Sequence, residues 1–350
     1  MQIKLISRCR TLLAGFGILV SATAPALAGT AAESQVEPWT EALVSVSEFG
    51  PATRLLRYAG GWRLVNSGEM DSSQLAYWRL DETASGEFEL WCAPEADTGC
   101  IRFIRLSGVE QEPIRPAARA WDTGGIYSIM VRSDNIPALY DQALKLGWWA
   151  ESPPIRFQFG TSDLRNVVLT GPHGIHLAVY ERITPDFTAF PVGRISQGFN
   201  SMRMVRDRPV ARDFYRDMLG FDILFDSDRE PAEPAFSNFG IPFNYTPQIV
   251  RAAAALQPEL PGETGRIEVM QITGFTGHDH SDKASLPNLG IISVRYPVRD
   301  FATYRESLKA KGIAFAYEAQ DVVISGIGSV DLFAVRDPDG NLTEFYSAGE

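Results

Sequence analysis

Residues 333–350 at the end of the chain read FAVRDPDGNLTEFYSAGE, and this stretch carries the clearest structural signal in the sequence. The segment DPDG (337–340) has turn chemistry, because proline presets φ and glycine permits the positive φ that a reversal needs. The apolar residues on both sides predict two strands joined by this turn. In the second strand Leu342, Glu344 and Tyr346 share one face, since side chains alternate along a strand. A carboxylate on that face is either solvated or placed for a function.

This turn belongs to a unit of five predicted elements that begins near residue 289. A strand (289–298) is followed by a helix (299–311) that ends at Gly312, and three strands follow. Glycine directly after a helix supplies the left-handed residue with which many helices end. The order strand, helix, strand, strand, strand (βαβββ) is therefore predicted for the C-terminal part of the chain.

The same βαβββ order recurs three times earlier in the sequence, and its first copy is the faintest. The predicted helices of the second and third copies, 135–146 and 208–219, also end at glycine, Gly147 and Gly220. In the third copy QIVRAAAALQPE (248–259) is rich in alanine, which favours a helix. Because it occupies a strand position of the repeat, we predict a strand there.

Four βαβββ modules predict an α+β protein with two domains, each built from a pair of modules. Taking consecutive modules together, we expect an N-terminal domain at 30–187, a linker at 188–194 and a C-terminal domain at 195–350.

The first 28 residues are typical of a secretory signal peptide. Three basic residues precede an apolar run from Thr11 to about Val20, and Ala26-Leu27-Ala28 gives the small-x-small cleavage pattern. The apolar run is too short to span a bilayer as a helix, and an uncleaved signal anchor is the alternative. We therefore expect a periplasmic or secreted protein that begins near Gly29 and has no membrane contact after cleavage.

The mature chain is expected to be acidic and to keep two cysteines. Removing residues 1–28 takes three basic and no acidic side chains, so the net charge changes from −11 to −14. Such a charge repels nucleic acid and anionic membranes, so neither is an expected partner. Cys92 and Cys100 flank a predicted turn, and in an oxidising compartment they are expected to form a structural disulfide; two free buried thiols are the alternative.

Three segments, 213–226, 265–275 and above all 336–346, and the predicted helix after VRYPVRD (294–300) together resemble a known superfamily. It is the vicinal oxygen chelate superfamily of glyoxalase I, bleomycin resistance proteins and extradiol dioxygenases. The resemblance is strong in 195–350, moderate in the second module and weak in the first. It implies that two modules curl into a cup, whose first and last strands hold a divalent metal that chelates the substrate. It does not identify the reaction, since this fold serves lyases, isomerases, dioxygenases and binding proteins.

The resemblance places the family's ligand positions of the second predicted domain on Asn200, Glu268, Ser293 and Glu344. Two carboxylates, an amide and a hydroxyl form an all-oxygen set, which suits Mg²⁺, Mn²⁺ or Ca²⁺ better than Zn²⁺ or Fe²⁺. The missing histidines make a dioxygenase the least expected member. Two alternatives stay open, a hard divalent ion held by Glu268 and Glu344 or a cup without metal.

Further side chains are expected in the same cup. Strand alternation places Met202 beside Asn200 and points Arg295 into the cup. Two facing carboxylates need a cation between them unless one keeps its proton, and Arg295 is a candidate for that cation. One glutamate would then be available as a general base. The alternative is that Arg295 pairs only with a surface acid.

The histidines are expected to have other roles. In the first predicted domain the corresponding positions, near Glu41, Arg102 or Phe103, Ile126 and Ala178, form no coherent metal set. His176 is expected to be structural, and the alternative is that it enters that cup beside Glu41. His278-Asp279-His280 lies in a polar linker and predicts a solvated loop. If this loop folded over the cup, its imidazoles would supply the missing zinc or iron ligands.

Together these features predict an exported enzyme that acts on a small oxygenated organic molecule by lyase or isomerase chemistry. Glu268 and Glu344 are expected to be catalytic groups or metal ligands, and the expected substrate contacts are Asn200, Met202, Ser293, Arg295 and Tyr346. The alternative from another class is a non-catalytic protein that sequesters a small molecule, as bleomycin resistance proteins do. Either protein is expected to be a monomer or a homodimer.

Overall fold

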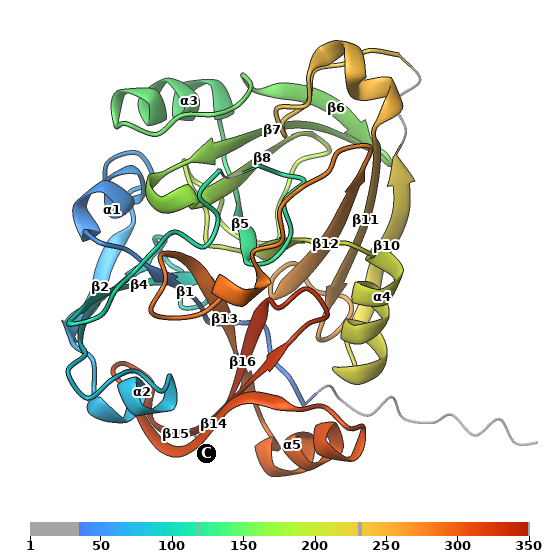
Figure 1. The fold of residues 1–350 in the computed structure, drawn as a ribbon. Helices are drawn as coiled ribbons and strands as arrows, with labels where there is room; N and C mark the ends of the chain where they lie inside the picture. The colour runs from blue at the N-terminus through green and yellow to red at the C-terminus, as the bar shows by residue number, and fades with distance from the viewer. Residues whose placement is uncertain (1–34, 118, 230–232, 349–350) are drawn as a thin grey trace, which may run out of the picture. The chain divides into compact units, whose positions relative to one another are not determined.

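The computed structural model describes residues 35–117, 119–229 and 233–348, which form two curved sheets flanked by helices (Figure 1). The predicted signal peptide, residues 1–28, lies outside the described residues. No helix within the described ranges is both long and apolar enough to cross a bilayer.

All four predicted βαβββ modules are present. Module 1 contains β1 (Glu41–Ser45), α1 (Phe49–Tyr58), β2 (Arg63–Glu69), β3 (Ser85–Cys92) and β4 (Cys100–Ser107), with an additional helix α2 (Ser72–Tyr77) after β2. Module 2 contains β5 (Ile126–Arg132), α3 (Ile136–Lys145), β6 (Ile155–Phe159), β7 (Ser162–Thr170) and β8 (His176–Thr184). Module 3 contains β9 (Asn200–Met204), α4 (Arg208–Asp213), β10 (Asp222–Arg229), β11 (Val250–Gln257) and β12 (Arg266–Thr273). Module 4 contains β13 (Gly290–Val298), α5 (Phe301–Ala310), β14 (Phe315–Ile324), β15 (Gly328–Arg336) and β16 (Leu342–Ser347).

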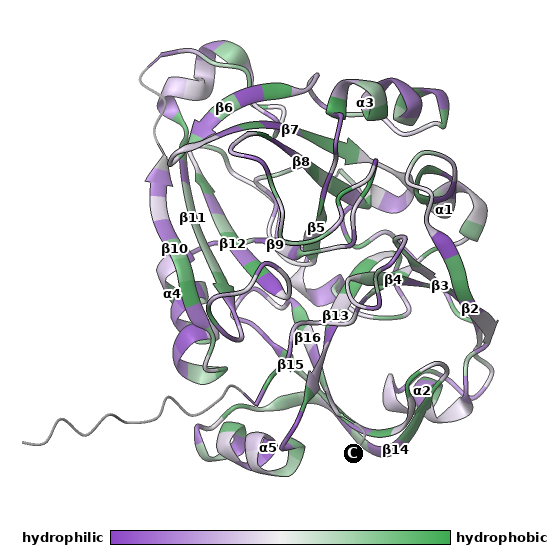
Figure 2. Ribbon diagram, turned by 180° about the vertical axis from the view of Figure 1, so that it is seen from behind, coloured by the Kyte–Doolittle hydropathy of each residue, from purple (hydrophilic) through white to green (hydrophobic). Residues whose placement is uncertain are grey.

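The helix boundaries follow from local chemistry. At the start of α5 the side chain of Asp300 accepts a hydrogen bond from the backbone N–H of Thr303, and Asn135 and Asp207 cap α3 and α4 in the same way. Gly147, Gly220 and Gly312 follow the helical segments with positive φ, as the sequence predicts. The helices carry both polar and apolar residues and lie along the sheets (Figure 2).

The alanine-rich segment of module 3 is the strand β11, as predicted. It pairs antiparallel with β10 on one side and β12 on the other, and Ala254, Ala255 and Leu256 are buried. The sheet on both sides therefore outweighs the helical propensity of alanine.

The pairing of the modules differs from the predicted one. One eight-stranded sheet has the order β14-β15-β16-β13-β1-β4-β3-β2 and joins modules 1 and 4; we call it the terminal sheet. The other has the order β10-β11-β12-β9-β5-β8-β7-β6 and joins modules 2 and 3; we call it the central sheet. The expectation that 30–187 and 195–350 each pair their own two modules is thus wrong, although the four modules do form two domains of two modules each.

The joints between modules explain this pairing. In each sheet the first strands of two modules meet antiparallel, β1 against β13 and β5 against β9. In the terminal sheet Glu41 stands opposite Arg295, so that a carboxylate meets a guanidinium in the buried centre.

Three groups of buried apolar side chains fill the molecule. The largest contains residues of both sheets and of the helices, including Trp39, Tyr215 and Phe345. A second lies in the cup of the terminal sheet and includes α2, and a third lies in the cup of the central sheet. The two cups are therefore separate places, each formed by one sheet.

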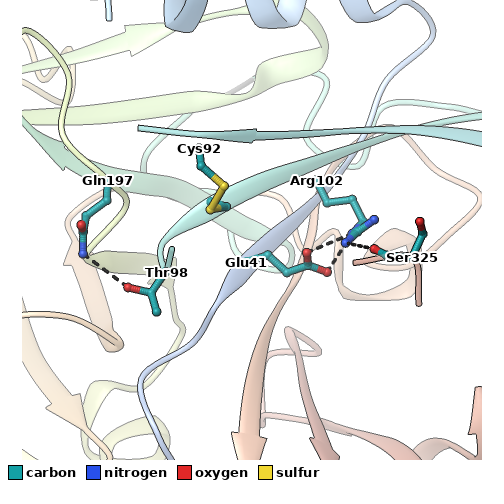
Figure 3. Close-up of a disulfide and its surroundings, with 7 residues drawn as sticks. Glu41, Cys92, Thr98, Arg102, Gln197 and Ser325 are labelled. Carbon is teal, nitrogen blue, oxygen red and sulfur yellow. Dashed lines mark hydrogen bonds and ion pairs between the residues drawn. A yellow bond between two sulfur atoms is a disulfide. The ribbon is translucent and has the colours of Figure 1, made fainter. Parts of the chain in front are cut away.

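The predicted disulfide is present in the structure. Cys92 at the end of β3 and Cys100 at the start of β4 are joined with a Cα–Cα distance of 4.4 Å (Figure 3). The bond closes the turn between two neighbouring strands of the terminal sheet.

Candidate functional site

The predicted site residues divide between the two cups. Ser293, Arg295, Glu344 and Tyr346 lie in the terminal sheet, whereas Asn200, Met202 and Glu268 lie in the central sheet. The prediction that Glu268 and Glu344 converge in one cup is therefore wrong, because it followed from pairing module 3 with module 4. Each cup has to be considered by itself.

The centre of the terminal cup is an ion network of two glutamates and two arginines. Arg295 Nη1 donates to Glu41 at 2.8 Å and Arg295 Nε to Glu344 at 3.0 Å. On the other side of Glu41, Arg102 Nε donates to both carboxylate oxygens, at 2.9 and 3.0 Å, and Arg102 Nη2 donates to the carbonyl of Ser325 (Figure 3). All four ionic side chains are at most 3% exposed.

The electrostatics of this network favour permanent ionisation. Burial alone would raise the pKa of Glu41, but the attraction of Arg102 and Arg295 outweighs it and holds that pKa below its ordinary value. Burial would lower the pKa of Arg295, but Glu344 and Glu41 raise it above its usual range. The four charges cancel, so the network needs no further ion for neutrality.

Side chains and helix α2 close the terminal cup. Gln74 Nε2 of α2 donates to the carbonyl of Val323 at 2.8 Å, and the backbone N–H of Val323 donates to Ser73 Oγ. Tyr77 and Trp78 pack beneath this cover, and Trp78 lies 4.8 Å from the ring of Tyr317, measured between centroids. Tyr346, a predicted substrate contact, shares a hydrogen bond with Thr40 inside the same cluster.

A divalent metal does not fit the terminal cup. Glu344, the predicted ligand, accepts hydrogen bonds from Ser293 and Arg295, and Glu41 accepts from two guanidinium groups. A metal ion at this point would lie against two fixed cations, which Coulomb repulsion opposes. The guanidinium of Arg295 lies between Glu344 and Glu41, and not between Glu344 and Glu268 as the sequence predicted.

The central cup differs, because it contains a large cavity of about 860 Å³. Its size is in the range of small-molecule sites in proteins. Strands β5, β8, β9, β11 and β12 supply its floor and walls, and the rings of Phe159 and Phe225, on the two edge strands, meet 5.3 Å apart between centroids. The apolar side chains that line it include Met130, Leu164, Phe199, Phe225, Phe239 and Met270.

Glu268 is the buried carboxylate of this cavity. It is 8% exposed, and one of its oxygens accepts a hydrogen bond from Asn200 Nδ2 at 3.2 Å. Burial raises the pKa of Glu268 to about 7, although the bond from Asn200 and the charge of Arg266 act in the opposite direction. Near neutral pH this side chain therefore exchanges a proton readily.

The family's metal does not fit the central cup either. Asn200 Nδ2 also donates to the sulfur of Met130 at 3.1 Å, so the neighbours of Glu268 are an amide and a thioether. In the part of the chain that the structure describes, no group of three or more histidine, cysteine, aspartate or glutamate side chains is arranged to hold a metal ion. One carboxylate with these partners is a poor site for a hard divalent ion.

Three arginines stand beside Glu268 in the cavity. Arg132 on β5, Arg182 on β8 and Arg266 on β12 all line it, together with Glu263. Arg266 forms an ion pair with Glu263 at 3.1 Å, and Arg132 reaches the same carboxylate at 3.4 Å. The walls of the cavity thus carry more positive than negative charge around one buried glutamate.

The histidines lie outside both cups' ionic centres. His176 is buried and stacked on Tyr127, and burial lowers the pKa of His176 to about 3, so the ring is neutral. The backbone of the His278–His280 segment pairs with Thr123, and His280 Nε2 lies 3.6 Å from Asp122. We find no contact between these imidazoles and Glu344 or Glu268 in the described part of the chain.

Arg132 and Arg182 were missed by sequence reasoning. They lie two positions after Met130 and Tyr180 on strands whose alternate side chains face the cavity. The alternation was visible in the sequence, but it has this meaning only once modules 2 and 3 are known to share a cup.

Residues 200–345 match the family model of the Glyoxalase/Bleomycin resistance protein/Dioxygenase superfamily. This match shows similarity to the superfamily over residues 200–345, which is less than half of the chain. The matched residues cover modules 3 and 4, which are consecutive in sequence but lie in different sheets.

Solved structures support the fold of this superfamily over most of the chain. Glyoxalase I from Zea mays is similar with a TM-score of 0.57 and 14% identity, covering 89% of this chain and 92% of that one. A putative dioxygenase from Bacillus subtilis subsp. subtilis str. 168 has a TM-score of 0.54 and 14% identity, covering 90% and 86%. At such identities the likeness concerns the superfamily fold alone. No curated protein matches the sequence.

Proposed function

We propose that the central cup is the functional site and that the protein catalyses proton transfer on a small oxygenated organic molecule, as a lyase or isomerase. The observation that carries this proposal is Glu268, a buried carboxylate with a pKa of about 7 in a cavity of about 860 Å³. A group with a pKa near the working pH is present in both protonation states and can both accept and return a proton. Such a pair of steps moves a hydrogen between neighbouring carbons.

The roles of the residues follow from their contacts. Glu268 takes a proton from carbon next to a carbonyl group and gives it back, either to another atom or with loss of a leaving group. Asn200 holds Glu268 through its Nδ2 group, and its Oδ1 atom is buried without a hydrogen-bond partner among the described residues. That oxygen is positioned to accept a hydrogen bond from a substrate hydroxyl. The cationic side chains beside them stabilise negative charge on the substrate oxygen.

We propose that this reaction needs no divalent metal. The support is the donor chemistry of both cups. In the terminal cup guanidinium groups pair with the carboxylates, and in the central cup an amide flanks Glu268, while Glu263 pairs with arginines. The alternatives of magnesium, manganese or calcium, which the sequence left open, would require donors that neither cup presents.

The test is exchange of substrate hydrogen for deuterium. The purified protein is incubated in deuterium oxide with a panel of small carbonyl compounds, both neutral and anionic, and loss of the proton signal next to the carbonyl is followed by NMR. We expect exchange of at least one compound, and a fall of about 100-fold or more in Glu268→Gln. Glu259→Gln, which changes an exposed glutamate, is the matched control. Equal exchange by wild type and Glu268→Gln would refute the role of Glu268.

A second candidate is a non-catalytic protein that sequesters its ligand in the same cavity. The size and apolar lining of the cavity favour it as much as they favour an enzyme. A ligand that raises the melting temperature equally in wild type and Glu268→Gln, with no deuterium exchange of any compound, would support the binder and contradict the enzyme.

Export and oligomeric state are part of the proposal. We propose a periplasmic or secreted protein, supported by the signal-peptide pattern of residues 1–28 and by the disulfide of Cys92 and Cys100. Mass spectrometry of the mature protein should find its N-terminus near Gly29, and size-exclusion chromatography should give the mass of a monomer or a homodimer. A full-length cytosolic product would contradict export.

A further inference from the structure

The arginines of the central cup hold more positive charge than their protein partners neutralise. Arg132 is 6% exposed, and its Nε atom has no hydrogen-bond partner among the described residues. The buried Nε atom of Arg182 likewise has none in the described chain. Buried donors of this kind are usually satisfied, so two in one cavity wall point to a missing acceptor.

The charges of the three arginines act on one another. Burial, together with the charges of Arg182 and Arg266, lowers the pKa of Arg132 to about 10, whereas Glu263 acts in the opposite direction. Among the described residues, Glu263 is the carboxylate that pairs with this group, and it is shared by Arg132 and Arg266. Three guanidinium groups with one shared carboxylate leave room for an anion.

Aromatic rings hold these arginines in place. The guanidinium carbon of Arg132 lies 3.9 Å from the ring centre of Phe187 and 4.5 Å from that of Phe199. Arg182 lies 5.2 Å from the same Phe187 ring. A cation between two rings keeps a fixed plane, which prepares its N–H groups for a planar, two-oxygen acceptor such as a carboxylate.

The rest of the cavity is suited to an apolar group. Its remaining wall includes Met130, Leu164, Phe225, Phe239 and Met270. The cavity volume of about 860 Å³ exceeds the needs of a free inorganic anion and accommodates an aromatic or aliphatic body.

We propose that the ligand of the central cup is an organic carboxylate with an apolar or aromatic body, whose anionic end is held by Arg132 and Arg182. The inference rests on the proposed function in using the same cavity, and it adds the chemical class of the substrate. Arg266 stands between the two ends, because its strand neighbour in register is Asn200, the partner of Glu268. The carboxylate is therefore bound at one end while the reacting carbon is presented to Glu268.

The experiment compares two probes of nearly equal shape, the anion naphthoate and its neutral amide naphthamide, by isothermal titration calorimetry. Wild type should bind naphthoate about tenfold or more tightly than naphthamide, a preference that weakens as the ionic strength rises. Arg132→Gln and Arg182→Gln should each reduce this preference toward equality. Arg57→Gln, which changes an exposed arginine of α1, should keep it.

Thermal melting of the unliganded variants gives a second readout. Arg182 is half-buried and its removal relieves repulsion from Arg132, so Arg182→Gln should melt at the wild-type temperature or above it. This variant keeps the test valid even if Arg132→Gln folds poorly. Equal binding of the two probes by wild type, binding of neither, or a preference that survives both substitutions would overturn the proposal.

The outcomes also separate this inference from the proposed function. Preference for naphthoate without deuterium exchange of any carbonyl compound supports the anion site and contradicts catalysis. Exchange of neutral compounds by a protein that shows no preference for naphthoate supports catalysis and overturns the anion site.

Discussion

The two cups of this protein are built from the same βαβββ modules, yet they use their interiors in opposite ways. In the terminal cup two arginines pair with two glutamates, α2 covers the opening and apolar side chains fill the space. In the central cup a glutamate stays without a cationic hydrogen-bond partner in the described chain, and the arginines exceed their acidic partners beside an open cavity. In this protein a matched set of charges forms a structural centre, whereas an unmatched set leaves room for a ligand.

The largest expected effect is in the terminal cup. Arg295→Met removes the guanidinium that pairs with buried Glu344, while Arg102 still pairs with Glu41. Removing one partner of a buried ion pair costs about 3–5 kcal/mol of unfolding free energy. Urea unfolding should show this loss, and Arg57→Met on the surface should change the free energy by less than about 0.5 kcal/mol. Similar values for the two variants would mean that the network is not a structural centre.

A second effect in the terminal sheet concerns its disulfide. Replacing both Cys92 and Cys100 by serine frees a short loop in the unfolded chain and should cost about 2–3 kcal/mol. Denaturant unfolding would measure the loss, with binding of naphthoate as the control. If probe binding in the central cup fell together with stability, the two cups would not be independent.

The free energy of unfolding should depend on pH through Glu268 in the central cup. Burial raises the pKa of Glu268 to about 7, because the folded protein holds the neutral carboxyl more favourably than the ionised one. The folded state holds this proton more tightly than the unfolded state, and stability is therefore lost as pH rises from about 4.5 to about 7. Between pH 5 and pH 8 wild type should lose about 2 kcal/mol relative to Glu268→Gln.

Chemical unfolding at several pH values would show this difference. The groups around Glu268 are Asn200, which is uncharged, and Arg266, which stays charged throughout. Parallel pH profiles of wild type and Glu268→Gln would contradict the raised pKa.

The smallest expected effect is that of metal removal. Because the donors of neither cup suit a divalent ion, treatment with a chelator and addition of Mg²⁺, Mn²⁺ or Ca²⁺ should leave the melting temperature unchanged. A shift that depends on the concentration of one of these ions would show that a metal binds after all.

The modules could be predicted from the sequence because their signals are local. Turn residues such as Gly340, helix-ending glycines and alternating strands all act within a few residues of one another. Even the alanine-rich β11 was predictable, since its place in the repeat is a stronger signal than its composition.

Which modules pair in one sheet was not predictable from such local signals. All four modules present a fully buried first strand, and local patterns do not specify which two of them meet. The signal that distinguishes the pairs is long-range, such as Glu41 opposite Arg295. Pairing module 3 with module 4 placed Glu268 and Glu344 in one cup, whereas the structure places them in different sheets.

The chemical reasoning about facing carboxylates was nevertheless sound. The sequence indicated that two buried glutamates would need a cation between them and that Arg295 was available. The structure shows Arg295 between Glu344 and Glu41, which is a different glutamate from the expected one. Glu268, without such a partner, is left with the raised pKa.

The most direct test of the central claim is the titration of Glu268 by NMR of the protein labelled with carbon-13 at glutamate carboxyl groups. The signal of Glu268 is assigned by its absence from Glu268→Gln. We predict that it titrates with a midpoint near pH 7, while Glu41, held by two arginines, stays ionised well below that pH. A Glu268 midpoint below about pH 5, the range of an ordinary glutamate, would contradict the account of the central cup as the reactive one.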